Sequence, residues 1–444
     1  MIMVQSVYKC FILALGLMFA SCSQSKSKEI LETNLEVENP DTIKLDTFGC
    51  VENGKFIIEH DIDLKGHVCL LSKGISLIKK RGVIKNGILI GNCTRLQAEG
   101  ALFDKVTIKG TWDVPYITTK LFADLDYENS LYDVVALANS KVQNKVVVEK
   151  GIYHVRAQKN ADVCVPICNN TDFILNGTIR LKPNGFKNYD ILRAKGKNIK
   201  ISGNGTIIGD KHTHTGTTGE WGMGIRFHHA TNATLSGLTI KNCWGDCIYV
   251  GGNSRNVLIE KCRLDHGRRQ GISVTKASGV TIRKCMITNV SGTNPQYAID
   301  IEPNRPDSVD NILIENVTVR DCEGGFLVVH GAPKEGAVTP WIGNVTIRNC
   351  DVKSRKKYPV RVARCEKIEI NKCKLYAPDG LSAIAVANSG NAIVQNNNIS
   401  VHYNLTDKVK NEIRAIVGKG KRYPIDIRLT NRQSVNNNRF LSRR

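Results

Sequence analysis

The chain has 444 residues, of which 41% are hydrophobic and only 6% aromatic, and it contains 38 glycines. This composition allows a large core of small and β-branched side chains, which favours an all-β protein and argues against a helical one. Lys and Arg number 62 against 41 Asp and Glu, a formal net charge of +21, so the expected partner is a polyanion: nucleic acid, an anionic membrane surface or an acidic polysaccharide.

Residues 1–22 have the features of a signal peptide. Lys9 precedes an apolar run from Phe11 to Phe19, and small residues then lead to Cys22. This ending resembles the lipobox of bacterial lipoproteins, which implies cleavage before Cys22 and lipidation of its thiol. We therefore expect an exported protein, lipid-anchored in the bacterial cell envelope on the periplasmic side or at the cell surface. Its contact with membrane would be the anchor only, and an acidic polysaccharide replaces nucleic acid as the leading polyanion.

The remaining chain is expected to fall into three parts. Residues 23–44 are polar and would form a tether, and residues 45–120 alternate in short runs that predict a small β region. Residues 121–444 are expected to form one long β domain. It opens with a segment that predicts a short helix over Ser130–Ala138, followed by a pair of strands.

From about Asn198 onward the chain repeats a unit of two or three short strands. Segments such as "NVLIEKCRL", "GVTIRKCMI" and "NVTIRNCDV" alternate and end at an Asn or Gly corner, and each is followed by a second alternating run such as "CIYVGG", "GISVTK" or "AIDIEP". Repeats of unequal length with polar insertions predict a parallel β-solenoid, whose coils stack and whose hydrophobic end needs a cap. The helix over Ser130–Ala138 is the expected cap.

Cysteines recur within these repeats. We expect them to stack inside the coils as small hydrophobic residues after one strand type, in preference to forming disulfides. The pairs Cys164/Cys168 and Cys243/Cys247 lack a second pair of ligands, so no structural zinc is expected. The recurring residues are Cys243, Cys262, Cys285, Cys322, Cys350 and Cys373.

Aligning the second strands of the repeats places polar side chains in columns. If Ile248, Ile272 and Ile299 point inward, period-two alternation sends their neighbours outward. One outward column is Arg226, Tyr249, Ser273 and Asp300, and another is His228, Gly251, Thr275 and Glu302. A column of small residues, Gly224, Cys247, Gly271, Ala298 and Gly325, is expected to hollow a groove beside them.

Asp300 and Glu302 stand two residues apart on one strand, so their backbones are about 6.6 to 7 Å apart and face the same way. This is near the roughly 6.5 to 9.5 Å carboxyl separation of inverting glycosidases, and rotation could reach the retaining value of about 5 Å. With Asp246, they are the candidate catalytic residues. The simpler alternative is that both carboxylates only solvate a strand or balance nearby arginines.

Loops that enter the same coils supply candidate substrate-binding residues. Trp offers a surface for stacking sugars, paired Arg can hold a carboxylate or sulfate through two hydrogen bonds, and His can donate or accept protons. The candidates are His212, His214, Glu220, Trp221, Arg226, Tyr249, His266, Arg268, Arg269 and Gln270.

These repeats, with "NSLYDVVALANSKVQNKVVVEKGIYHV" before them, resemble the right-handed parallel β-helices of the pectate lyase superfamily. The runs "GDCIYV" and "GRRQGIS" are similar to coils of the polygalacturonase-like glycoside hydrolases, in which Asp246 would match an acidic residue of the motif. However, Gly245 replaces the other acid and Gln270 the motif histidine, so that catalytic arrangement does not transfer. The chain is also similar to β-helix depolymerase domains of phage tail spikes.

Three functions remain open. The first is hydrolysis of an acidic polysaccharide by Asp300 and Glu302, with no cofactor. The second is a lyase or C5-epimerase reaction on uronic acids through Arg268 with Tyr249 or His266, with Ca²⁺ possible on Asp246, Asp300 and Glu302. The third is glycan binding or adhesion without catalysis. Whether the chain is a monomer or a trimer is left open.

Overall fold

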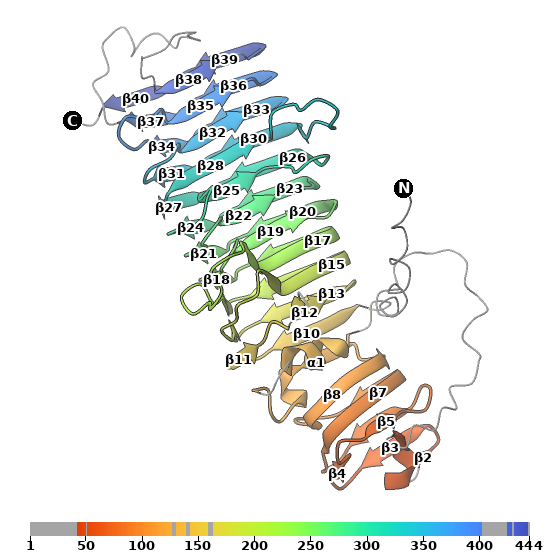
Figure 1. Ribbon diagram of the computed structural model, residues 1–444. Helices are drawn as coiled ribbons and strands as arrows, with labels where there is room; N and C mark the ends of the chain where they lie inside the picture. The colour runs from red at the N-terminus through yellow and green to blue at the C-terminus, as the bar shows by residue number, and fades with distance from the viewer. Residues whose placement is uncertain are drawn as a thin grey trace, which may run out of the picture. The chain divides into compact units, whose positions relative to one another are not determined.

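The computed structural model describes residues 42–49, 51–126, 130–138, 143–158, 163–401, 424–428 and 430–442 (Figure 1). The expected signal peptide, Cys22 and most of the tether, up to residue 41, lie outside the described residues, so lipidation stays a prediction. Among the helices that are described, none has the length and apolar character needed to cross a membrane.

The first described strands form a sheet of their own. Strand β7 is its centre, because β4, β5, β6 and β8 all pair with it in parallel. Buried side chains such as Phe56, Leu77 and Leu89 form its core. The strands of this sheet are β1 (Thr42–Lys44), β2 (Val51–Glu52), β3 (Lys55–Ile58), β4 (Ile62–Asp63), β5 (Val68–Leu70), β6 (Ser76–Lys79), β7 (Ile84–Gln97) and β8 (Phe103–Trp112), with the 3-10 turn Leu45–Phe48 between β1 and β2.

A short helix, α1 (Ser130–Ala136), follows this sheet in the chain. Leu131 and Val134 of α1 are fully buried, and α1 contacts β8, β11 and β12. The Asp133 carboxylate accepts a hydrogen bond from the backbone N–H of Ile108 at 2.8 Å. The helix therefore closes the apolar end of the stack, as predicted, although it ends two residues earlier than expected.

The rest of the chain forms stacked coils in which each strand pairs in parallel with its counterpart one coil later (Figure 1). Each complete coil contributes one strand to each of three sheets. The first sheet contains β12 (Val163–Ile167), the first halves of β15 (Asn188–Gly203) and β17 (Trp221–Ser236), β19 (Ile248–Gly251), β22 (Ile272–Val274), β25 (Tyr297–Ile301), β28 (Gly324–Val329), β32 (Val360–Ala363), β35 (Ile384–Ala387) and β38 (Ile425–Arg428).

The second sheet follows the first within each coil. It contains β9 (Tyr116–Thr118), β10 (Asn144–Val148), β13 (Thr171–Leu175), the second halves of β15 and β17, β20 (Ser254–Glu260), β23 (Ala277–Arg283), β26 (Ser308–Glu315), β29 (Trp341–Ile342), β30 (Asn344–Arg348), β33 (Lys367–Asn371), β36 (Asn391–Gln395) and β39 (Arg432–Asn436). The 3-10 turn Thr119–Leu121 follows β9.

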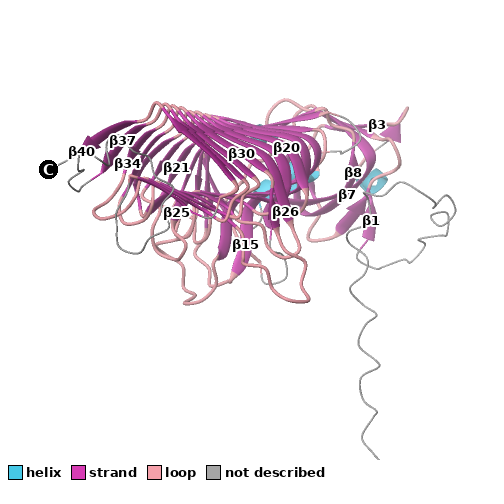
Figure 2. Ribbon diagram, turned by 90° about the horizontal axis from the view of Figure 1, so that it is seen from above, coloured by secondary structure: helices cyan, strands magenta, loops and turns pink. Residues whose placement is uncertain are grey.

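The third sheet completes each coil. Within the described residues it has 11 strands: β11 (Ile152–Val155), β14 (Thr178–Leu181), β16 (Thr206–Ile208), β18 (Thr239–Lys241), β21 (Arg263–Asp265), β24 (Met286–Thr288), β27 (Thr318–Cys322), β31 (Asp351–Ser354), β34 (Lys374–Tyr376), β37 (Asn398–Val401) and β40 (Arg439–Ser442). Seen from above, loops project from one side of the stack beside β15 and β25 (Figure 2). This architecture confirms the predicted all-β parallel β-helix.

The sequence of the corners explains how the coil turns. Between the second and third sheets, successive coils place Asn or Lys in the left-handed region, for example Asn316 at φ 54° and Asn349 at φ 55°. Asn tolerates this conformation because its short polar side chain can bond locally. The residue after the turn points inward, and in four coils it is a buried cysteine: Cys262, Cys285, Cys350 or Cys373.

Two cysteines occupy a different corner from the predicted one. Cys243 follows the third-sheet strand β18 and Cys322 ends the third-sheet strand β27, and each comes after a left-handed residue, Asn242 or Asp321, both at φ 57°. At both corners the chain turns inward close to a neighbouring segment. Only a small buried side chain fits there. All six recurring cysteines are free and buried, which confirms their role as packing residues.

Candidate functional site

The first sheet brings the predicted polar column together. Arg226, Tyr249, Ser273 and Asp300 are partners in register on β17, β19, β22 and β25. The isoleucines beside them, Ile225, Ile248, Ile272 and Ile299, are fully buried and stack inside the coils. Alternation therefore placed these polar residues on the outer face of the first sheet, as predicted.

The column of small residues has a different role from the predicted one. A Cβ added at Gly271 would lie 2.6 Å from Ile287 Cγ2, and one added at Gly325 would lie 2.6 Å from Val352 Cγ1. Cys247 and Ala298 of the same column are fully buried. These positions face the interior corner between the third and first sheets, where there is no room for a larger side chain, so they do not hollow an outer groove.

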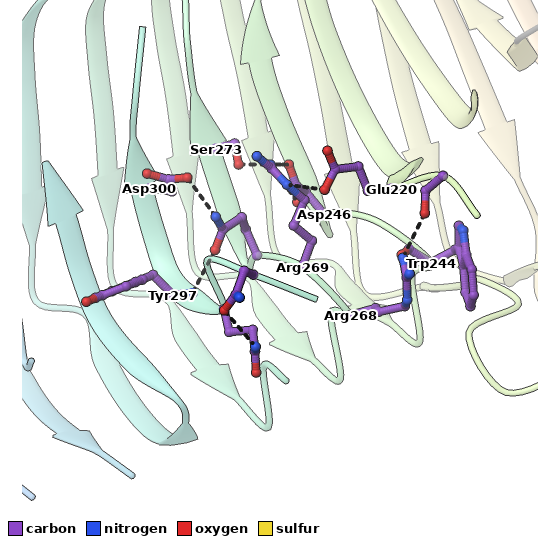
Figure 3. A network of polar contacts seen from close by, with 12 residues as sticks. Glu220, Trp244, Asp246, Arg268, Arg269, Ser273, Tyr297 and Asp300 are labelled. Atoms are coloured by element: carbon purple, nitrogen blue, oxygen red, sulfur yellow. Dashed lines mark hydrogen bonds and ion pairs between the residues drawn. The ribbon is translucent and has the colours of Figure 1, made fainter. Parts of the chain in front are cut away.

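Arg269 is the centre of the polar network on the outer face (Figure 3). Its guanidinium lies 3.2 Å from the Asp246 carboxylate and 3.3 Å from that of Glu220. Asp246 is completely buried, and Ser273 donates a 2.7 Å hydrogen bond to its Oδ2. Burial raises the pKa of Asp246, while Arg269 and Ser273 act in the opposite direction. Glu220 and Asp246, from the loops of two coils, thus both meet the guanidinium of Arg269, which belongs to a third.

Asp300 lies in the same network but is hidden from solvent. It is 1% exposed, and its Oδ2 accepts a 2.6 Å hydrogen bond from Gln270 Nε2. The Tyr297 backbone N–H donates to Gln270 Oε1 at 2.7 Å, which fixes the orientation of the amide. Burial, and then the negative charge of Glu302, raise the pKa of Asp300 well above 3.8. The expectation that Asp300 faces solvent is therefore wrong, because loop side chains cover it.

Two further features decide what the carboxyl groups of Asp300 and Glu302 can do. Asp300 Oδ1 is buried and has no hydrogen-bond partner among the described residues. Glu302 follows β25 on the same side and is only partly buried. One carboxyl group thus keeps its proton to a higher pH than an ordinary aspartate, while its neighbour meets solvent.

A second cluster surrounds Trp244, and it uses residues expected to contact substrate. The Arg268 guanidinium lies 3.7 Å from the Trp244 ring and donates to the carbonyls of Gly219 and Trp244, each at 3.1 Å. The His214 ring stacks on Trp244 with a centroid separation of 3.9 Å and bonds Asp210 through Nδ1 at 2.8 Å. Arg268 and His214 therefore hold the loops in place, and the His214 side chain has no exposed surface.

A third group lies at the N-terminal side of the column. Arg226 forms a 2.9 Å ion pair with the buried Asp190 and sits 4.8 Å above the Tyr249 ring. The Tyr249 hydroxyl is 2.7 Å from Thr275 Oγ1. Arg193, the register partner of Arg226, also pairs with Asp190. Tyr249 is thus held from two sides on the outer face.

The remaining predicted residues form no ion pair with Arg269 among the described residues. His212 is exposed, and its ring lies 6.2 Å from that of His266, whose Nδ1 is 2.7 Å from Asp265 Oδ2. Trp221 opens β17 and is 47% exposed, which leaves its ring available to stack on a ligand. Gln270, which replaces the motif histidine of polygalacturonases, is buried and orients Asp300.

Sequence reasoning missed Asp190, Tyr297 and the bonding role of Ser273. A contact that recurs between coils explains Asp190 and Ser273. In each such contact, the first residue lies two positions before the inward isoleucine of its own coil, or before Leu192 in β15. It bonds the residue that lies one position after the inward isoleucine of the next coil. The pairs are Asp190 with Arg226, Asp246 with Ser273, and Gln270 with Asp300. An alignment of the coils with both positions marked would have revealed this pattern.

The residues proposed as Ca²⁺ ligands form a different kind of site. Asp246 and Asp300 are engaged by Arg269 and Gln270, so a guanidinium and an amide occupy the space between carboxylates. Among the described residues, no three His, Cys, Asp or Glu side chains are arranged to hold a metal ion.

Comparison with known proteins agrees with this architecture. Residues 177–338 and 307–444 match the family described as "Right handed beta helix region". The uncharacterized protein YclG of Bacillus subtilis (strain 168) is 29% identical over 227 residues, 44% of this chain and 38% of that protein. The SPbeta prophage-derived uncharacterized protein YorA of the same strain is 27% identical over 191 residues, 37% of this chain and 32% of that protein. The chain thus aligns with less than two fifths of each relative's length.

Among solved structures, the A-module of the Azotobacter vinelandii mannuronan C-5 epimerase AlgE6 is similar, with a TM-score of 0.53 and 14% identity. The match covers 74% of this chain and 99% of that module. At this identity the likeness concerns the fold. Stacked parallel coils, three sheets and the family match together show that the chain belongs to the right-handed parallel β-helix family.

Proposed function

We propose that the protein is a carbohydrate-active enzyme that hydrolyses glycosidic bonds in an acidic polysaccharide. The observation that carries this proposal is the pair on β25 and just after it: a buried carboxyl with a raised pKa, Asp300, next to the partly exposed carboxylate of Glu302. Glycoside hydrolysis needs two carboxyl groups in different protonation states, and their environments separate them.

The environments suggest a role for each acid. Asp300 keeps its proton to higher pH, and its unpartnered Oδ1 would donate that proton to the leaving oxygen. Glu302, which meets solvent, would activate the water. We assign no such role to Asp246, because Arg269 and Ser273 already engage its carboxylate. Asp246 instead positions Arg269 toward the site.

The acidic nature of the substrate is supported by charge. The chain carries a formal net charge of +21. Arg269 retains 16% side-chain exposure on the same face as the two acids, so it can meet an anionic substituent of the sugar. Export and a lipid anchor at Cys22 would place the enzyme where such polymers occur, and both remain part of the proposal.

A direct experiment is to incubate the full-length protein with polygalacturonate, alginate and a sulfated glycosaminoglycan, and to measure reducing ends. Asp300→Asn and Glu302→Gln are each expected to lower the rate at least about a hundredfold, because a general acid or base usually contributes that much. Glu369→Gln, on β33 of the second sheet, is the control and should retain full activity. An active Asp300→Asn/Glu302→Gln double variant would refute the assignment.

A second candidate is removal of the C5 proton of a uronic acid, as a lyase or epimerase. The observation in its favour is Tyr249, whose hydroxyl is fixed by Thr275 and whose ring lies beneath the Arg226 guanidinium. A solved protein of similar fold is named a mannuronan C-5 epimerase, which motivates this test. Lyase products absorb in the near ultraviolet, and epimerisation in D₂O would introduce deuterium at C5 without shortening the polymer.

These readouts also identify a non-catalytic glycan-binding protein. Such a protein would retain the polysaccharide while size-exclusion chromatography showed an unchanged polymer, with no reducing ends, ultraviolet absorbance or deuterium uptake. That combination would reject both catalytic proposals.

A further inference from the structure

The segment Lys353–Arg364 concentrates positive charge on the coil that lies two steps beyond Asp300. It carries six cations, Lys353, Arg355, Lys356, Lys357, Arg361 and Arg364. Glu323 offsets part of this charge, since its carboxylate lies 3.3 Å from Lys356 and 4.0 Å from Arg355. None of these six residues was a candidate from sequence, because their loop carries no acid, His or Trp that would mark chemistry.

Arg361 occupies the same outward column as Asp300. Asp300 is in register with Leu327, and Leu327 with Arg361. Two coil steps separate Asp300 from Arg361, which is about 9.6 Å. The intervening Leu327 is 6% exposed and offers an apolar surface between them. The next residue in the column is Ala385, which is small and leaves space beyond the guanidinium.

Arg361 differs from the other arginines on this face in its ion pairing. Arg226 pairs with Asp190 at 2.9 Å, Arg269 with Asp246 at 3.2 Å, and Arg428 with Asp426 at 2.7 Å. Arg361 is exposed, and it has no carboxylate partner among the described residues. An arginine without an internal counter-ion can give its two-pronged hydrogen bonds to an external anion.

Aromatic side chains shape the surroundings of Arg361. Its guanidinium lies 5.9 Å from the Tyr358 ring. Burial raises the pKa of Tyr297 to about 12, while Arg361 acts in the opposite direction. Lys357 anchors the neighbouring loop by donating to Pro295 O at 2.6 Å and to Asn294 Oδ1 at 2.9 Å. The site of Arg361 is therefore walled by fixed groups.

We propose that Arg361, with Tyr297 and Tyr358, forms a subsite for the anionic group of a sugar residue that neighbours the cleaved one. This inference rests on the proposed function, because it takes Asp300 and Glu302 as the point of cleavage. The polysaccharide then runs along the first sheet, across the coils, from the acid pair toward Arg361. Uronate carboxylate and sulfate ester share the chemistry that this guanidinium recognises.

The test is affinity electrophoresis of the full-length protein in gels that contain alginate, polygalacturonate, chondroitin sulfate or neutral dextran. Arg361→Ala is expected to weaken binding to the preferred acidic polymer roughly ten- to hundredfold, the value of a hydrogen-bonded charge pair, and to leave dextran unaffected. Arg361→Lys should recover only part of the affinity, since it lacks the planar fork. Preference for the uronate polymers or for chondroitin sulfate identifies the anion.

Two matched variants make the result specific. Arg255→Ala removes an exposed arginine of β20 on the second sheet and should bind as the unmodified protein does. Lys353→Ala alters a cavity of 540 Å³ that Lys353, Arg355 and Tyr376 line at the edge of the third sheet. If Lys353→Ala weakens binding and Arg361→Ala does not, or if neither does, the subsite at Arg361 is rejected. If no polymer is cleaved but Arg361→Ala still loses affinity, only the proposed reaction fails.

Discussion

Asp300 shows how far the environment of a single side chain decides its chemistry. Strand alternation sends it out of the coil interior, but Gln270 and the loops from neighbouring coils then remove it from water. Glu302, two residues later, escapes this cover. Two carboxyl groups on one short segment thereby differ in burial, and burial raises the pKa of Asp300.

The raised pKa of Asp300 predicts how stability depends on pH. The folded state holds this proton to a higher pH than the unfolded chain, whose aspartates ionise near a pKa of about 3.9. The stabilising contribution is therefore complete below that value and is lost as pH rises through the folded pKa. Thermal melting should show the unmodified protein losing stability relative to Asp300→Asn as the pH rises above the unfolded pKa of about 3.9. Parallel pH profiles for the two proteins would contradict the burial of an ionisable acid.

Arg269 is the residue on which the buried charge of Asp246 depends. Replacing it by Met should cost about 3 to 5 kcal/mol of unfolding free energy, because it leaves a buried carboxylate without its cation. Adding Asp246→Asn should recover part of that loss, which a double-mutant cycle in urea would measure. A cost below about 1 kcal/mol for Arg269→Met would mean that water reaches Asp246.

At the scale of the elements, four coils place a buried cysteine at the corner between the second and third sheets. The thiols of Cys262, Cys285 and Cys350 each donate to the carbonyl two residues earlier, at 3.3 Å in every case. A cysteine can fill the corner and satisfy a carbonyl that the turn exposes. This dual role explains why the repeats use cysteine without forming disulfides.

The buried thiols of Cys322 and Cys365 should be inert in the folded protein. Burial raises the pKa of Cys322 and of Cys365 to about 12, and the thiolate is the reactive form. Labelling with iodoacetamide, followed by peptide mass spectrometry, should modify the exposed Cys93 in native protein and spare Cys322, Cys350 and Cys365. In denaturant without reductant, all four should react. A thiol that reacts only after reduction would show a disulfide instead.

The loops show the limit of strand-level reasoning. Their residues were correctly placed near one face, yet Arg268 and His214 serve the loop itself by stacking on Trp244. Contact between successive coils depends on loop conformation, which alternation does not specify. The residues of the Arg361 subsite were missed for a related reason, since an unpaired arginine is recognised only when every nearby carboxylate has been placed.

At the scale of the whole molecule, charge and stacking act together. The chain has a formal net charge of +21, and its arginines recur along the surface of the stacked coils. Most arginines on the first sheet form ion pairs with carboxylates of the coils. The cations left over determine where a long polyanion can lie. Stacking in register converts residues far apart in sequence, such as Asp300 and Arg361, into points on one line.

The sequence by itself determined the parallel β-helix, the capping helix and the outward column from Arg226 to Asp300. Period-two alternation and a repeated corner are local properties, and they dictate which side chains enter the core. Only the tertiary structure decided that Asp300 is buried, that Asp246 is tied to Arg269, and that the small residues face inward. Burial and ion pairing depend on which loops from other coils meet at a point, and that information is spread over residues far apart in the chain.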